Sequence, residues 1–402
     1  MQNIRNLTDD LIYIGCSDRK IALFESAYPV KEGMSYNSYL LKDNKTVLFD
    51  GVDKACDIQF FENLEGALAG KKLDYFVINH LEPDHSALIS EIVSKYADVQ
   101  IVTTQKAVNL INQFFEIESL NIKVVKEGDT LETGKHKLTF YMAPMVHWPE
   151  VMVTYDSFDK ILFSADAFGS FGAMNGNLFD DEVEFSSLIA EYSRYYTNIV
   201  GKYGLQVNNL INKAKNLSIE MICPLHGLIL RKHIAEIVEK YINWATYIPT
   251  VKSALVLYAS VYGNTQNTAE IIAGELSQNG IKNIKMHDVS ISDHSVIISD
   301  IFNYSHIILL STTYNNGIFV SMENLIREIV GHNIQGRTFA IVENGSWAPV
   351  SGDLMKKELE KIKDTKFIEN KLTIKSSPKS AQIGEIKAFA KAIADDIKSF
   401  IV

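Results

Sequence analysis

Short runs in which apolar and polar residues alternate fill the first part of the chain. Alternation with period two is typical of half-buried β-strands, and turns separate one run from the next. The predicted strands cover residues 11–16, 21–26, 36–41, 46–51, 75–80, 137–143, 151–156, 160–166 and 219–223. Helical stretches are interleaved with them at residues 86–96, 106–116, 182–204 and 231–246, the first opened by Ser86 as its N-cap. This mixture predicts a layered α/β sandwich rather than a simple parallel repeat.

The pattern changes after residues 246–254. From Ala254 onward, strands and helices alternate regularly, which predicts a doubly wound parallel sheet. We therefore expect two domains of different fold, residues 1–250 and residues 251–402. The five strands of the second domain are predicted within residues 254–260, 281–289, 306–312, 337–345 and 370–376.

Length and composition agree with two globular domains. The chain has 402 residues, of which 47% are hydrophobic and 22% charged, and its formal net charge is −10. This net charge argues against a protein that binds nucleic acid, which would usually show a concentrated basic face. The first residues lack the pattern of a signal peptide, and no apolar run reaches the roughly 20 residues that span a bilayer. The three cysteines, Cys16, Cys56 and Cys223, are scattered, so we expect no disulfide framework and a cytoplasmic location without a membrane partner.

Residues 80–85, His-Leu-Glu-Pro-Asp-His, follow directly on a predicted strand. Along an extended backbone, His80 and Glu82 point to one side and Asp84 follows the same line, while the loop lets His85 turn in beside them. Four side chains that bind metals can therefore face one point. This segment predicts half of a two-metal site.

Three further candidate ligands come at strand ends. His147 lies in the loop after residues 137–143, Asp166 ends residues 160–166, and His226 follows residues 219–223. A single histidine or aspartate in such a place is more often a turn or capping residue. Together with the four candidate ligands of residues 80–85, these three side chains would provide enough ligands for two metal ions.

Residues 260–265, Ser-Val-Tyr-Gly-Asn-Thr, stand at the first strand–helix junction of the second domain. Hydroxyl, amide and backbone N–H groups at a helix N-terminus can surround a phosphate, and Gly263 permits close approach of the backbone. The G-x-G-x-x-G pattern of dinucleotide sites is absent, so direct NAD binding is not expected. The predicted phosphate loop comprises Ser260, Val261, Tyr262, Gly263, Asn264 and Thr265.

Two later loops, residues 311–317 and 343–349, end the third and fourth strands of this domain. Their backbone groups can contact the polar edge of a cofactor ring, and Tyr314 or Trp347 can stack on its faces. The alternative for Trp347 is partial burial in a core. The candidate contacts are Thr312, Thr313, Tyr314, Asn315, Gly317, Asn344, Gly345, Ser346 and Trp347.

The order H-x-E-x-D-H, then His, Asp and His, resembles the metallo-β-lactamase superfamily. Glu82, together with the phosphate loop of a flavin mononucleotide (FMN) domain, is similar specifically to the flavodiiron proteins, and the resemblance covers essentially the whole chain. It implies a metallo-β-lactamase-like αββα sandwich followed by a flavodoxin-like domain, with two irons and FMN as cofactors.

The same resemblance implies the ligand sets. One iron takes His80, Glu82 and His147, the other takes Asp84, His85 and His226, and Asp166 bridges the two; family members differ in whether the histidine matching His85 is bound. The residue chemistry agrees, since hydrolytic relatives carry histidine in place of Glu82. A carboxylate there is a harder, anionic ligand that favours iron, whereas zinc has no redox chemistry.

The function implied by the resemblance is reduction of dioxygen to water, of nitric oxide to nitrous oxide, or of both, with electrons relayed through FMN. It also implies a head-to-tail homodimer or a tetramer, in which each flavin serves the partner's irons. Because the chain has no C-x-x-C pair, we expect no fused rubredoxin domain and a separate electron donor such as rubredoxin.

Three aromatic residues are candidates for a substrate pocket. Tyr195 and Tyr196 lie in the predicted helical region, where a phenol can donate a hydrogen bond to a bound oxygen species, and Trp148 follows His147. Aromatic residues at helical spacing more often belong to a core. Residues 356–379 carry eight lysines and four acids, which can dock an acidic electron carrier or be a solvated face.

Two other functions remain open on the sequence. A zinc hydrolase with an accessory flavin domain would use the same ligand frame, but Glu82 in place of histidine argues against it. A module that only shuttles electrons through FMN would not need seven metal ligands at matched spacings.

Overall fold

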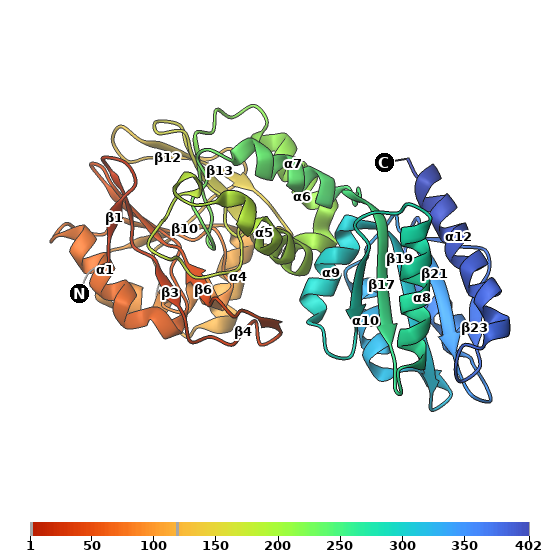
Figure 1. The fold of residues 1–402 in the computed structure, drawn as a ribbon. Helices are drawn as coiled ribbons and strands as arrows, with labels where there is room; N and C mark the ends of the chain where they lie inside the picture. The colour runs from red at the N-terminus through yellow and green to blue at the C-terminus, as the bar shows by residue number, and fades with distance from the viewer. Residues whose placement is uncertain (1–2, 118–119, 402) are drawn as a thin grey trace. The chain divides into compact units, whose positions relative to one another are not determined.

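A computed structural model describes residues 3–117 and 120–401. The chain forms two compact units, Met1–Ile242 and Asn243–Val402 (Figure 1). The sequence places the domain boundary at residue 250, inside the segment that links α7 (Ile234–Ala245) to the first strand of the second unit, and that boundary stays a prediction.

The N-terminal unit contains a mixed sheet of seven strands. Its strands pair in an antiparallel manner as far as β8 and in parallel from β8 to β11. In spatial order they are β1 (Arg5–Asn6), β2 (Leu11–Tyr13), β7 (Tyr39–Lys42), β8 (Thr46–Phe49), β9 (Tyr75–Val77), β10 (Gln100–Thr103) and β11 (Ile122–Val124). Two small antiparallel pairs accompany it: β3 (Cys16–Asp18) with β6 (Met34–Tyr36), and β4 (Leu23–Phe24) with β5 (Tyr28–Pro29).

A second sheet of five strands packs against the first. Phe49 on β8 stacks on Phe163 of the second sheet, with ring centroids 3.8 Å apart, and Tyr39 meets the same ring edge-on. The two sheets therefore share one core, as expected for a sandwich. The strands of the second sheet, in spatial order, are β12 (Thr130–Glu132), β13 (Lys137–Met142), β14 (Met152–Asp156), β15 (Ile161–Phe163) and β16 (Met221–Cys223).

The helices of this unit differ from the prediction in two places. Ser86 does not cap a helix; it ends a short one, and its hydroxyl donates to the carbonyl of Leu81 at 2.7 Å. The single helix expected over residues 182–204 is broken by a π-helical turn, η4 (Tyr196–Val200). All of residues 192–200 are buried, so no one-sided apolar stripe marked the breaks in the sequence. The helices are η1 (Lys54–Cys56), α1 (Asp57–Leu68), α2 (Pro83–Ser86), α3 (Ile89–Lys95), α4 (Gln105–Phe114), η2 (Asp180–Glu182), η3 (Phe185–Leu188), α5 (Ile189–Tyr195), η4 (Tyr196–Val200), η5 (Gly201–Tyr203), α6 (Gly204–Ala214) and α7.

The C-terminal unit is a parallel sheet with helices on both faces. Its strand order, β18-β17-β19-β21-β22, places the first strand of the unit between the second and third, as in doubly wound folds. Two short strands extend it: β20 pairs antiparallel with β19, and β23 pairs parallel with β21. The strands are β17 (Val251–Ala259), β18 (Lys285–Asp288), β19 (Tyr304–Tyr314), β20 (Gly317–Ile318), β21 (Thr338–Asn344), β22 (Lys366–Phe367) and β23 (Leu372–Ile374).

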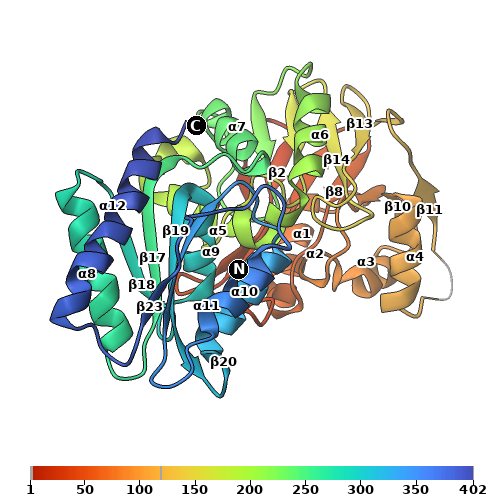
Figure 2. The same cartoon turned by 90° about the vertical axis from the view of Figure 1, so that its right-hand side faces the viewer.

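Two helices cover one face of this sheet, where Ile272 and Phe389 pack into a core with Val256 and Leu310. They are α8 (Asn264–Gln278) and α12 (Ile383–Ser399), the latter preceded by η6 (Ser380–Gln382). The other face carries α9 (His294–Asn303), α10 (Val320–Gly331) and α11 (Ser351–Leu359), as Figure 2 shows from a second side. Within the described residues, none of the helices combines the length and the apolar character needed to cross a membrane.

Candidate metal centre and cofactor pocket

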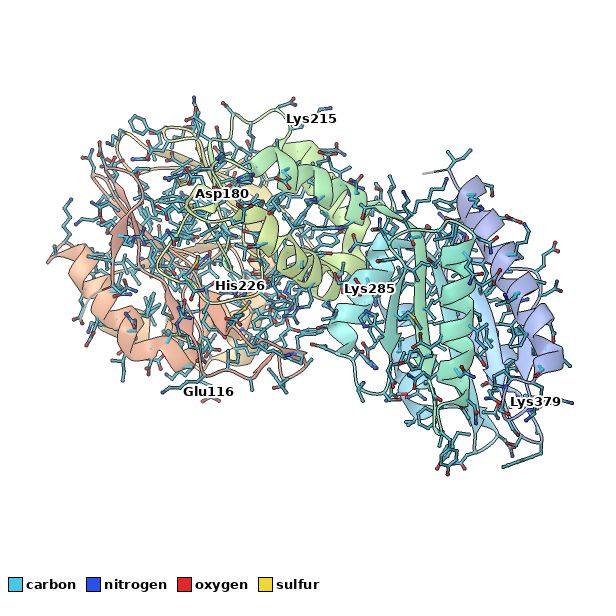
Figure 3. All side chains as sticks on the ribbon, in the orientation of Figure 1. Glu116, Asp180, Lys215, His226, Lys285 and Lys379 are labelled. Carbon is cyan, nitrogen blue, oxygen red and sulfur yellow. The ribbon has the colours of Figure 1, made fainter. Side chains whose placement is uncertain are left out.

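All seven predicted metal ligands meet at one edge of the N-terminal sandwich. His80, Glu82, Asp84 and His85 follow β9 of the first sheet, Glu82 immediately before α2 and the last two within it. From the second sheet, His147 comes from the β13–β14 loop, Asp166 follows β15, and His226 follows β16. His226 lies among the side chains in the interior of the unit (Figure 3) and is fully buried. Both sheets therefore contribute side chains to the same place.

The seven side chains form two groups joined by Asp166. In the first group, Nε2 of His80 lies 3.1 Å from Oε2 of Glu82, and Nε2 of His147 lies 2.9 Å from the same oxygen. Oδ2 of Asp166 lies 3.2 Å and 3.0 Å from these two nitrogens. Four donor atoms thus converge on one position.

In the second group, Oδ2 of Asp84 lies 3.1 Å from Nε2 of His85 and 3.2 Å from Nε2 of His226. Asp166 turns its other oxygen, Oδ1, toward this group, 3.4 Å from His85. One carboxylate therefore faces both positions, which is the arrangement of a bridging ligand.

The donors of the second group fit a metal ion better than they fit one another. The Nε2 atoms of His85 and His226 lie 3.0 Å apart, so at most one of them can donate a proton to the other. Both carboxylate oxygens of Asp84 are buried and lack an aligned donor among the described residues. A cation at the centre of the group would satisfy all of these atoms at once.

The electrostatics of the site also favour cations. Burial alone would lower the pKa of His85, but Asp84 and Asp166 raise it to about 10, and Asp166 and Glu82 likewise raise the pKa of buried His147 to about 9. Burial opposes ionisation of Asp166, yet His80 and its neighbours hold the pKa of that carboxyl well below its usual range. The buried carboxylates thus attract positive charge, and metal ions can take the place of the protons.

Aromatic side chains surround the two groups. The ring of Tyr195 lies 5.6 Å from that of His226, whereas Tyr196 packs at 4.8 Å against Tyr241. Trp148 meets the ring of His80 edge-on at 5.5 Å. Of the two candidate tyrosines, Tyr195 is therefore the one whose ring is seen to lie against a histidine of the candidate metal site.

Two neighbours of the site could not be predicted from the sequence. Phe24 meets His226 edge-on at 5.3 Å, and Glu150 lies 2.8 Å from Nδ1 of His80. No spacing rule marks either residue, because each is brought in by the path of a loop or a short hairpin.

A third group of possible ligands, Asp10, His136 and Asp159, lies away from these positions. Nδ1 of His136 binds Asp156 at 2.7 Å, and Lys135 forms an ion pair with Asp10. These charges already compensate one another, so the group needs no metal.

In the C-terminal unit, a cavity of about 670 Å³ opens at the carboxyl ends of the strands. Its size is typical of a pocket for a cofactor. All of the predicted cofactor contacts line it except Gly263 and Gly317, and Asn316, Ala348 and Ser376 join them. Gly317 instead lies in β20, beyond a two-residue turn in which Asn315 and Asn316 have positive φ angles of 49° and 57°.

The phosphate loop has the backbone that such a site requires. Gly263 adopts φ 84°, a left-handed conformation, directly before α8, and its N–H donates to Oγ of Ser260 at 3.0 Å. Thr265 lies deeper, where its hydroxyl bonds Thr312 at 2.9 Å and accepts from Asn344 at 3.2 Å. Trp347, at the mouth of the cavity, is 89% exposed, as a ring that stacks on a bound cofactor would be before binding.

Comparison with known proteins agrees with both halves of this architecture. The model of the ODP family beta lactamase matches residues 34–227, and the flavodoxin model matches residues 256–380. The anaerobic nitric oxide reductase flavorubredoxin of Klebsiella pneumoniae is 32% identical over 92% of this chain and 76% of its own length, and that of Vibrio vulnificus 33% over 85% and 70%.

Solved structures give the same result. The rubredoxin oxygen:oxidoreductase of Desulfovibrio gigas superposes with a TM-score of 0.94 at 28% identity, covering 99% of each chain. A flavoprotein of Thermotoga maritima gives 0.90 at 26% identity over 99% of each chain. The predicted fold class, cofactors and family are confirmed, and the zinc hydrolase does not hold. With a lactamase-like sandwich carrying the candidate ligands and a flavodoxin-like unit carrying the pocket, the chain belongs to the flavodiiron proteins, a family of FMN-dependent diiron oxidoreductases.

Proposed function

We propose that this chain reduces dioxygen to water, nitric oxide to nitrous oxide, or both, at the paired metal positions of its N-terminal unit. The observation that carries this proposal is the position of Asp166, whose two oxygens face two separate groups of ligands. Two metals held by one carboxylate can bind both ends of a diatomic molecule or two small molecules side by side. The names of the relatives, nitric oxide reductase in one case and oxygen oxidoreductase in the other, support both substrates.

We propose the following ligands. One iron is held by His80, Glu82 and His147, the other by Asp84, His85 and His226, and Asp166 joins them. Bound there, the irons would supply one-electron chemistry to the gas, and FMN in the C-terminal pocket would supply the electrons. His85 belongs in the second set because its Nε2 points to the same centre as that of His226.

The side chains around the metals have roles of their own. Tyr195 is the tyrosine that we assign to the substrate pocket, where its phenol would donate a hydrogen bond to a reduced oxygen atom and hold a proton close by. Phe24 and Trp148 would exclude bulk water from one side of the histidine rings.

The electron donor and the assembly are also proposals. A rubredoxin-type protein is the donor that the names of the relatives favour. A head-to-tail dimer or a tetramer would bring each flavin near a partner's irons. Some lysines of residues 356–379 are already neutralised within the chain. Lys371 forms ion pairs with Glu343 and Asp353, and Lys361 forms one with Glu358. The remaining lysines of residues 356–379 would have to make up any docking surface.

The test starts from protein purified without oxygen. We expect about two irons and one FMN per chain and consumption of dioxygen or nitric oxide when a chemical reductant replaces the natural donor. Asp166→Ala should lose iron and gas consumption while keeping FMN. Asp181→Ala, which removes only a surface pair with Arg231, is the matched control. Zinc in place of iron, or gas consumption that survives Asp166→Ala, would contradict the proposal.

A further inference from the structure

The two metal-binding groups present the same donor atoms. Each offers two imidazole nitrogens and one carboxylate of its own, and each shares Asp166. When the atoms that touch the metals are alike, a difference between the positions must come from the groups behind the imidazoles. The members of the two groups are His80, Glu82 and His147, and Asp84, His85 and His226.

Behind His80 lies a buried carboxylate. Oε1 of Glu150 is 2.8 Å from Nδ1 of His80 and also accepts the backbone N–H of Leu81 at 3.0 Å. The side chain of Glu150 is 1% exposed, and Thr104 donates to the backbone carbonyl of the same residue at 3.0 Å. An acceptor fixed in this way requires a proton on Nδ1 of His80, which leaves the lone pair of Nε2 for a metal.

Behind the histidines of the second group there is no carboxylate at hydrogen-bond distance in the described part of the chain. Nδ1 of His226 lies 2.7 Å from the backbone carbonyl of Ser35, a neutral acceptor. Nδ1 of His85 is buried and has no hydrogen-bond partner among the described residues. One imidazole here is held by a neutral group, and the other is not held through Nδ1 at all.

We propose that Glu150 is a positioning residue that makes the two metal positions unequal. Through His80, its charge strengthens binding at the His80–Glu82–His147 position and favours the oxidised metal there. The physical reason is that an anionic acceptor at Nδ1 makes the imidazole a stronger electron donor, and burial leaves that charge weakly screened. The inference rests on the proposed iron sites.

The substitution Glu150→Gln tests the charge without removing the acceptor. Glutamine keeps a carbonyl oxygen for His80 and Leu81, so the loop can keep its path. The matched control is Glu182→Gln. The carboxylate of Glu182 likewise accepts two hydrogen bonds, here from the backbone N–H groups of Leu178 and Phe179, and within the described residues it touches none of the proposed metal ligands. FMN content and the thermal unfolding curve report whether each variant is folded.

The readouts are iron affinity and reduction potential, measured on the full chain loaded with iron. In a competition with a chelator under anaerobic conditions, Glu150→Gln should weaken the binding of one iron about 10–100-fold and leave the other within about twofold. In a potential titration followed by electron paramagnetic resonance, one of the two iron potentials should rise. The control should match the parent in both measurements.

A measurement on the parent protein needs no variant. Chains depleted to about one iron should retain it at the His80 position, which anomalous diffraction can locate. The inference would be overturned if the parent protein retained its one iron at the Asp84 position. It would also be overturned if Glu150→Gln weakened the binding of both irons equally or changed the binding of neither. A parent protein that binds no iron would instead refute the proposed function, so the two failures can be told apart.

Discussion

Removing one oxygen atom from Tyr195 should stabilise the protein and slow its reaction at the same time. The side chain is fully buried, and its hydroxyl has no hydrogen-bond partner among the described residues. Burial, with the negative charges of Asp166 and Asp84, raises the pKa of the phenol well above its ordinary value, so the hydroxyl stays protonated. A polar group in this state costs the fold about 1–3 kcal/mol.

Tyr195→Phe keeps the ring, which contacts Phe171 at 5.2 Å, and removes only the unsatisfied group. We therefore expect a gain of about 1 kcal/mol, or about 2–4 °C in the unfolding temperature of a unit of this size. If the phenol donates a proton or hydrogen bond to the reduced gas, consumption should fall at least about tenfold. Thermal and urea unfolding of metal-free protein and gas uptake by the loaded protein measure the two effects.

Tyr39→Phe is the matched control. Tyr39 is equally buried, but its hydroxyl donates to the carbonyl of Pro224 at 2.6 Å. The same deletion there should lower the free energy of unfolding by about 1 kcal/mol, because the hydrogen bond to Pro224 is lost and that carbonyl keeps only its bond from Nδ2 of Asn37 at 2.9 Å. Equal destabilisation in both variants would refute the account of Tyr195, and unchanged gas uptake would refute its role in the reaction.

Three further predictions concern other regions. Trp347→Ala should leave the fold unchanged but weaken FMN binding about 10–100-fold, if the exposed ring stacks on the flavin; a fluorescence titration of the apoprotein measures this. Arg337→Met should lower the free energy of unfolding by about 2–6 kcal/mol in urea titrations, because the buried guanidinium donates to the carbonyls of Ile301 and Phe302; a loss below about 1 kcal/mol would contradict this. Burial lowers the pKa of His136, but its hydrogen bond with Asp156 raises the pKa by more, so the net shift is upward. The charged imidazole therefore stabilises the fold up to about pH 6.5, and this stabilisation is lost as the pH rises through the pKa of the folded state. In His136→Gln, unfolding temperatures should therefore depend less on pH above 6.5 than in the parent protein.

The side chains that we propose as metal ligands could be picked out in the sequence because they follow strands. His80 and its neighbours occupy one short segment, and the remaining ligands each stand just after a strand of the second sheet, where open sheets bring loops together. Such positions can be read from period-two patterns. The two-residue turn at Asn315 and Asn316 is also encoded locally, since adjacent residues of this type before a glycine favour a tight hairpin.

Other features could not be read in this way. Glu150 reaches His80 only because of the path of the β13–β14 loop, and no spacing encodes that path. Tyr195 and Tyr196 are neighbours in sequence, yet the ring of the first lies against His226 and the ring of the second against Tyr241. A π-helical turn begins at Tyr196, and it changes the direction of every later side chain. Its position depends on packing in a segment that is buried on all sides.

Because the proposed ligands come from both sheets, metal loading should act as a crosslink across the sandwich. His85 follows a strand of the first sheet, and His226 follows a strand of the second. A ligand that binds only the folded state adds about 2.7 kcal/mol of stability at a hundredfold excess over its dissociation constant. The resistance of the N-terminal unit to unfolding and proteolysis should therefore follow the iron supply of the cell, and iron shortage would lower the amount of this protein as well as its activity.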